Sequence, residues 1–135
     1  MLRPLIENIA QESESAQRLL ELCIRPLLLC LHMPALVQQA TTLLLQIVFF
    51  SSTCELFIQL ITVSELMFQI FQEAILKNKD SDDLIIILQK ITSKEPTIVE
   101  SLLSVKTIEM LHSEMDRRDD FVKQNIKSIL RLITD

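Results

Sequence analysis

The sequence contains no glycine, no tyrosine and no tryptophan. Tight β-turns rely on glycine for positive φ angles, and β-strands are enriched in aromatic and β-branched residues. This chain instead draws its apolar content mainly from Leu and Ile, with Gln, Glu, Lys and Ser between them. The composition therefore predicts an all-α fold. The lack of glycine also excludes phosphate-binding loops and the glycine-rich dinucleotide fingerprint.

Chain length and net charge narrow the possible classes of protein further. A chain of 135 residues corresponds to one domain or to part of a larger one. The formal net charge of -5 argues against a nucleic-acid binder, which needs a basic face to displace counterions. The three cysteines, Cys23, Cys30 and Cys54, are an odd number in apolar surroundings, unlike a secreted disulfide framework. We expect reduced thiols, at least two of them buried, in an intracellular protein of the cytoplasm or the nucleus.

Residues 26 to 53 carry no Asp, Glu, Lys or Arg, which raises the question of a membrane span. A spanning helix needs about 20 predominantly apolar residues in one run. Pro34 disfavours helical geometry in the residue before it, so we expect the stretch to divide there. Beyond it, apolar residues recur with helical spacing while Gln39, Thr42 and Gln46 lie on the other side. The polar stripe indicates water or a protein partner, and we expect no membrane contact.

Caps and helix breakers predict a series of helices. Pro26 and Pro34 are expected to open helices as first-turn prolines. Asp80, Ser81 and Asp82 are expected to provide a cap for the helix over 82–93, and Asp119 and Asp120 for the last helix. Residues 84–88, LIIIL, could also form a strand, but we interpret them as a buried helix. The expected helices cover residues 2–11, 14–23, 26–32, 34–50, 53–61, 63–77, 82–93, 95–104, 105–115 and 119–134.

The order of short and long helices repeats along the chain. Isoleucines near the ends of the long helices, Ile9, Ile47, Ile91 and Ile133, are separated by 38, 44 and 42 residues. A period near 42 residues with three helices in each unit is typical of stacked helical repeats.

The stretch EPTIVESLLSVKTIEMLHSEMDRRDDFVKQNIKSILRLI, residues 95–133, resembles an armadillo repeat. In that family a short helix turns sharply into a second, and a polar loop leads to a long third helix. The apolar positions of the third helix are matched by Val122, Ile126, Ile129, Leu130 and Ile133. The family's usual glycine between the first two helices is missing, which leaves HEAT-like packing as an alternative.

The resemblance implies a right-handed α-solenoid of about three repeats, forming one domain over residues 1–135. The repeats would cover residues 13–50, 51–93 and 94–135, with residues 1–12 as the end of an incomplete repeat. A chain that begins in this way is compatible with a piece of a longer protein.

Few residues are placed to carry chemistry. His32 and His112 have no Cys or carboxylate partner at metal-ligand spacing. The acidic cluster at residues 80–83 is typical of a helix N-terminus, and residues 115–120, MDRRDD, are interpreted as a solvated loop. We expect no catalytic residues, no cofactor and no metal.

The armadillo resemblance implies a concave groove lined by the third helices, which would bind a peptide or helix of another protein. The groove is expected to be neutral and mixed in character. Its residues would be Asn8, Gln39, Thr42, Gln46, Asp83, Ile86, Lys90, Asn125 and Ser128.

Charge distribution points to a second surface. Residues 1–75 hold 10 charged residues, whereas residues 76–135 hold 21. A charge-poor half suggests contacts beyond its own core. We therefore expect a non-enzymatic scaffold that binds another protein through the groove or the N-terminal half, without direct contact to nucleic acid. An alternative is an obligate subunit of a helical homo- or heterodimer, and a third is an apolar-ligand carrier with phenylalanines lining a cavity.

Overall fold

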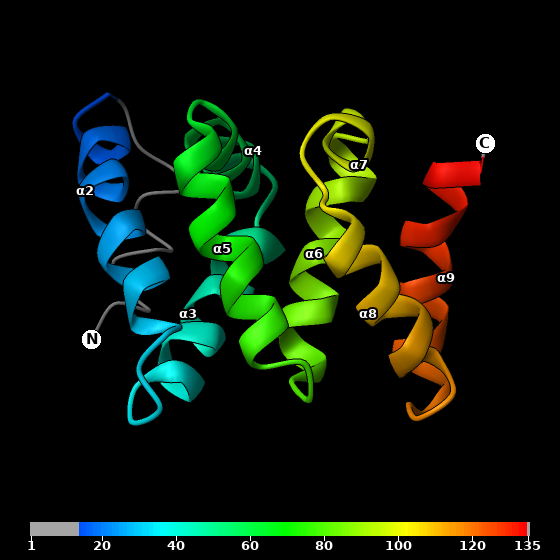
Figure 1. Ribbon diagram of the computed structural model, residues 1–135. Helices are drawn as coiled ribbons and strands as arrows, with labels where there is room; N and C mark the ends of the chain where they lie inside the picture. Colours follow the sequence, from blue (N-terminus) through cyan, green and yellow to red (C-terminus); the bar gives the residue numbers. More distant parts are fainter. Residues whose placement is uncertain (1–13, 135) are drawn as a thin grey trace. The chain divides into compact units, whose positions relative to one another are not determined.

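The computed structural model describes residues 14–134, and within them all regular structure is α-helical (Figure 1). The predicted all-α fold is thus confirmed for these residues. The predicted helix over 2–11 and the incomplete repeat at 1–12 lie outside the described residues. The helices are α2 (Glu14–Cys30), α3 (Val37–Phe49), α4 (Ser51–Thr62), α5 (Glu65–Lys77), α6 (Asp82–Lys94), α7 (Thr97–Ser101), α8 (Val105–Met115) and α9 (Asp120–Thr134).

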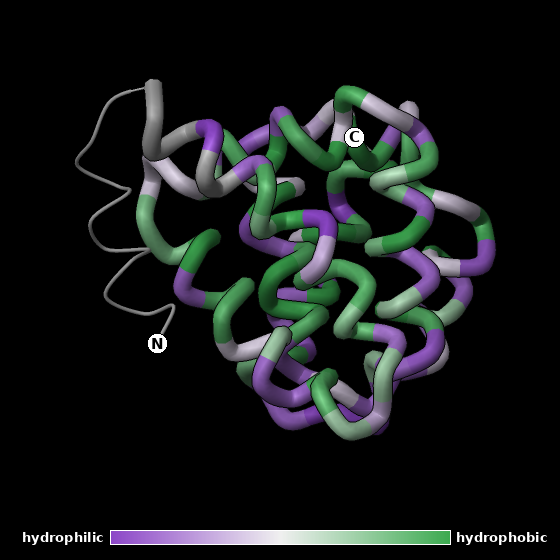
Figure 2. Tube along the Cα trace, turned by 90° about the vertical axis from the view of Figure 1, so that its left-hand side faces the viewer, coloured by the Kyte–Doolittle hydropathy of each residue, from purple (hydrophilic) through white to green (hydrophobic). Residues whose placement is uncertain are grey.

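The chain divides into two compact units, Met1–Phe71 and Gln72–Asp135, and the division falls within α5. The described part of the first unit holds α2, α3, α4 and the beginning of α5. The second unit holds the rest of α5 and the helices α6 to α9. Figure 2 shows apolar and polar residues alternating along the helical trace, as expected for helices that each bury one side.

In the first unit, α3 packs against α4, and α2 contacts both. Phe57, Phe68 and Phe71 are fully buried, and their rings meet edge to face with centroids 5.9 Å and 6.1 Å apart. Aromatic pairs of this kind contribute about 0.5–1.5 kcal/mol beyond their buried area. Phe49, by contrast, is 73% exposed and pairs with Phe50. The phenylalanines therefore do not line one common cavity.

In the second unit, α9 packs against α6, α7 and α8, and α6 also contacts α7. The LIIIL segment lies in α6, where Leu84, Ile85, Ile87 and Leu88 are fully buried and Ile86 is half-buried. Residues at these consecutive positions surround most of a helix, so α6 is covered on several sides. The interpretation of this segment as a buried helix is confirmed.

The predicted break at Pro26 is wrong, because α2 runs without interruption from Glu14 to Cys30. A proline inside a helix removes one backbone hydrogen bond, here to the carbonyl of Leu22. Both Pro26 and Leu22 are exposed, so water can reach that carbonyl. The buried side of α2 continues past the proline at helical spacing, which holds the two halves together. That side consists of Ile24, Leu27 and Leu28, and the buried Leu31 follows in the turn after the helix.

Pro34 also acts differently from the prediction. It lies in a turn, and the helix starts later, at Val37. The backbone N–H groups of Leu36 and Val37 both donate to the carbonyl of Met33, at 2.9 Å. That shared acceptor closes the turn before α3 begins.

Helix ends in the second unit follow the predicted caps. The Ser81 hydroxyl accepts from the Leu84 N–H at 3.3 Å, and the Asp119 carboxylate accepts from the Val122 N–H at 3.0 Å. Each bond satisfies one of the unpaired N–H groups of a first turn. Helix α7 is shorter than the predicted segment 95–104, because the N–H groups of residues 102 and 103 both turn back to the carbonyl of Ile98.

The cysteines are free thiols, but the expectation that at least two are buried is wrong. Only Cys54 is buried, while Cys23 and Cys30 are half-buried. The latter two lie two turns apart on α2, at one edge of its buried side, so each is covered on one flank only.

Among residues 14–134, no single helix has the length and apolar character needed to cross a bilayer. Helices α3 and α4 would satisfy both requirements if taken together, but the chain bends by 114° between them.

Candidate functional site

The first part of the predicted groove lies on α3. Gln39 and Thr42 are exposed and Gln46 is half-buried, and their spacing puts them on one side of the helix. The Thr42 hydroxyl donates to the carbonyl of Gln38 at 3.0 Å, so its oxygen remains available mainly as an acceptor. These residues form an accessible polar stripe on the surface of the first unit.

The second part lies on α6 and α9, which pack against each other in the second unit. Asp83, Ile86 and Lys90 form a half-buried stripe on α6, and Asn125 and Ser128 form another on α9. Two neighbouring helices thus carry five of the predicted groove residues. Asp83 and Lys90 give these five residues one negative and one positive side chain.

The polar groups on α9 are partly engaged within their own helix. The Asn125 amide donates to the carbonyl of Phe121 at 2.9 Å, and the Ser128 hydroxyl donates to the carbonyl of Gln124 at 3.0 Å. Both side chains can still accept hydrogen bonds from a ligand. Asn8 lies outside the described residues, and the α3 stripe belongs to the other unit.

A further apolar surface, missed in the sequence, lies on α2. Leu22, Leu29 and Met33 are 68%, 46% and 49% exposed, and the exposed Pro26 stands between the first two. The spacing of Leu22, Pro26 and Leu29 places them on the side of α2 opposite to its buried residues. Met33 lies in the turns beyond the helix, where its N–H donates to the carbonyl of Cys30 at 3.1 Å. We call these four residues the α2 outer face.

The α2 outer face escaped detection because the segment was divided at Pro26. If residues 14–23 and 26–32 formed two separate helices, Leu22 and Leu29 would lie on different helices and would share no common side. In one helix of 17 residues they are two turns apart and aligned. Arg18 and Arg25, both exposed, border the same face.

His32 has a structural partner in the first unit. Its Nε2 donates to the carbonyl of Ile70 at 2.9 Å, which joins the turn after α2 to α5. Among residues 14–134, no three His, Cys, Asp or Glu side chains are grouped so that they could hold a metal ion.

The interpretation of residues 115–120 as a solvated loop is wrong for Arg118, whose side chain is only 10% exposed. Its guanidinium donates to Glu114 at 2.9 Å and to the carbonyl of Asp80 at 2.9 Å. It also contacts the Asp82 carboxylate and the carbonyl of Lys79. Arg118 therefore fastens the linker between α5 and α6 to the end of α8.

Gln72 makes a similar connection at the other end of α8. It is buried, and its Oε1 accepts from the Ser104 N–H at 2.6 Å and from the Thr107 hydroxyl at 2.8 Å. Its amide also lies 3.4 Å from the carbonyl of Leu102. Helix α5 thus holds the linker between α7 and α8 in place.

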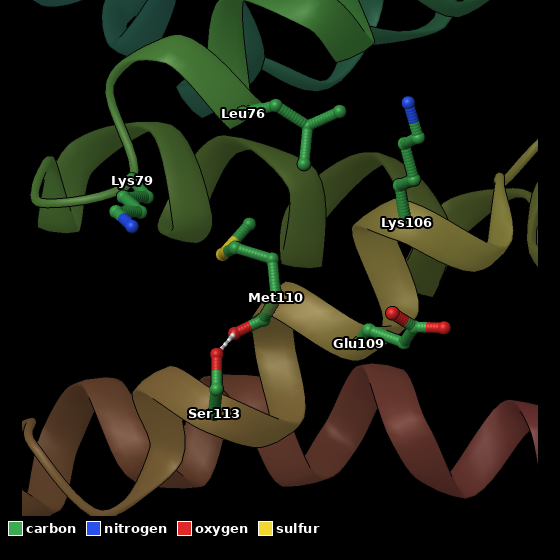
Figure 3. A pocket seen from close by; sticks show the side chains of 6 residues that line it. All are labelled: Leu76, Lys79, Lys106, Glu109, Met110 and Ser113. Carbon is green, nitrogen blue, oxygen red and sulfur yellow. Dashed lines mark hydrogen bonds between the residues drawn. The ribbon is translucent and has the colours of Figure 1, made fainter.

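A hollow of about 430 Å³ opens between α5 and α8 in the second unit. Figure 3 shows Leu76 and Met110 extending into the space between the two helices, with Lys79 and Lys106 to either side. Glu109 and Ser113 complete the lining, and the Ser113 hydroxyl donates to the carbonyl of Met110 at 3.0 Å. The hollow has an apolar floor and a rim of mixed charge.

Comparison with family models, with curated proteins and with solved structures finds no match for this chain.

Proposed function

We propose that this chain is a non-enzymatic scaffold that binds another protein. The observation that carries the proposal is the α2 outer face. Leu22, Leu29 and Met33 are each about half exposed or more, and Leu22 and Leu29 are aligned on α2. Aligned apolar side chains on a surface are typical of a protein-interaction site, whereas single exposed ones are ordinary.

The scaffold is proposed to be an α-solenoid of armadillo-like repeats. Helices α7, α8 and α9, with 5, 11 and 15 residues, have the short, short, long order of one such repeat. Helices α4, α5 and α6 are nearly equal in length, with 12, 13 and 13 residues. The last helices of the two sets, α6 and α9, pack against each other, as stacking of neighbouring repeats requires. The proposed repeat boundaries near residues 50 and 93 lie close to the ends of α3 and α6. In the first repeat, α2 would take the place of both short helices.

The stripes on α3, α6 and α9 are proposed as a second binding surface. Their side chains are accessible or half-buried, and none belongs to the buried core. Amide and hydroxyl groups such as those of Gln39 and Asn125 could hold the backbone of a bound segment, and Ile86 could hold an apolar side chain. This arrangement suits a peptide of mixed composition.

Affinity capture with matched variants tests the proposal. The wild-type chain is compared with Leu22→Gln/Leu29→Gln, which alters the α2 outer face, and with Asp83→Ala/Lys90→Ala/Asn125→Ala, which alters the stripes. Both variants should keep the wild-type circular dichroism spectrum. A protein retained by one variant and lost with the other supports the scaffold and identifies its surface. Identical capture by all three chains would contradict both surfaces.

A helical dimer is the alternative, because the α2 outer face could also pair with a second copy. Sedimentation over a hundredfold concentration range distinguishes the two. A monomer throughout contradicts the homodimer, and a dimer dispersed by Leu22→Gln/Leu29→Gln contradicts the monomeric scaffold.

A further inference from the structure

We draw no further inference here: the strongest candidate, the hollow of about 430 Å³ between α5 and α8, has an exposed rim that carries both positive and negative side chains, and nothing among the described residues shows what would occupy it.

Discussion

The guanidinium of Arg118 and the carboxylate of Glu114 are joined at 2.9 Å, although the side chains are only 10% and 4% exposed. Glu114 also lies 3.6 Å from Arg117, whose side chain is 71% exposed. The exposed Arg117 and the largely buried Arg118 therefore contact the same carboxylate. The position of each arginine, and not its charge alone, decides what the contact contributes.

Removal of Arg118 should be costly. Arg118→Ala leaves the Glu114 carboxylate buried without its main partner, which typically lowers the free energy of unfolding by about 3–5 kcal/mol. Arg117→Ala is the matched control and should cost less than about 1 kcal/mol, because an exposed ion pair is screened by water. Urea unfolding followed by circular dichroism measures both. Equal losses in the two variants would show that Arg118 has no special role.

The double variant Arg118→Met/Glu114→Leu tests the same pair differently. It removes both charges and keeps apolar volume, so it should be more stable than Arg118→Ala. A double variant that is no more stable than Arg118→Ala would show that the unpaired Glu114 carboxylate is not the source of the loss.

Gln72→Leu should destabilise the chain by about 2–3 kcal/mol, because the half-buried Ser104 N–H and the buried Thr107 hydroxyl lose their shared acceptor. The side chains have nearly the same size, so the loss reports on hydrogen bonding. Gln69→Leu, at an exposed position of the same helix, is the control and should have a small effect. Urea midpoints that shift equally for the two variants would contradict the assignment of Gln72 as a buried connector.

Pro26→Ala should raise stability. The change restores an N–H to the middle of α2 and relieves the clash with the preceding turn, which together are worth about 1–3 kcal/mol in a helix interior. Pro26 is exposed, so no core contact is lost. The control is Pro34→Ala, because Pro34 lies in a turn and restores no helical bond. A lower thermal midpoint for Pro26→Ala would mean that α2 depends on its proline.

Thiol labelling should separate the cysteines. Under native conditions Cys23 and Cys30 should react with a soluble disulfide reagent, whereas Cys54 should react only when its helix opens. Mass spectrometry of timed samples counts the labels on each cysteine. Simultaneous labelling of all three would contradict the burial of Cys54.

Caps and helical spacing in the sequence predicted much of the fold. Helix α8 has the predicted bounds 105 and 115, and the Ser81 cap was visible because polar residues precede a strongly apolar run. Pro26 misled the prediction, because a local rule for proline does not include the burial of Ile24 and Leu28 on either side of it. Tertiary packing outweighs a local preference of this size.

The connections made by Arg118 and Gln72 were beyond sequence reasoning. Arg118 meets residues 36 to 39 positions away, and Gln72 meets residues 30 to 35 positions away. No periodic pattern relates such pairs. The mixed charges around Arg118 are typical of a solvated loop, and only the arrangement of α6 and α8 determines which arginine becomes buried. The α2 outer face could not be predicted either, because it depends on α2 being one continuous helix.

Arg118 and Gln72 hold the two linkers mainly through backbone atoms: the carbonyls of residues 79, 80 and 102 and the N–H of Ser104. Every amino acid provides a carbonyl, and every one except proline provides an N–H. Substitutions at Lys79 or Leu102 would therefore leave these attachments in place. Insertion or deletion of one residue would move the bonded atoms out of reach. Over generations of mutation, linker positions held only through their backbone, such as 79 and 102, should drift in sequence while the lengths of the two linkers stay fixed.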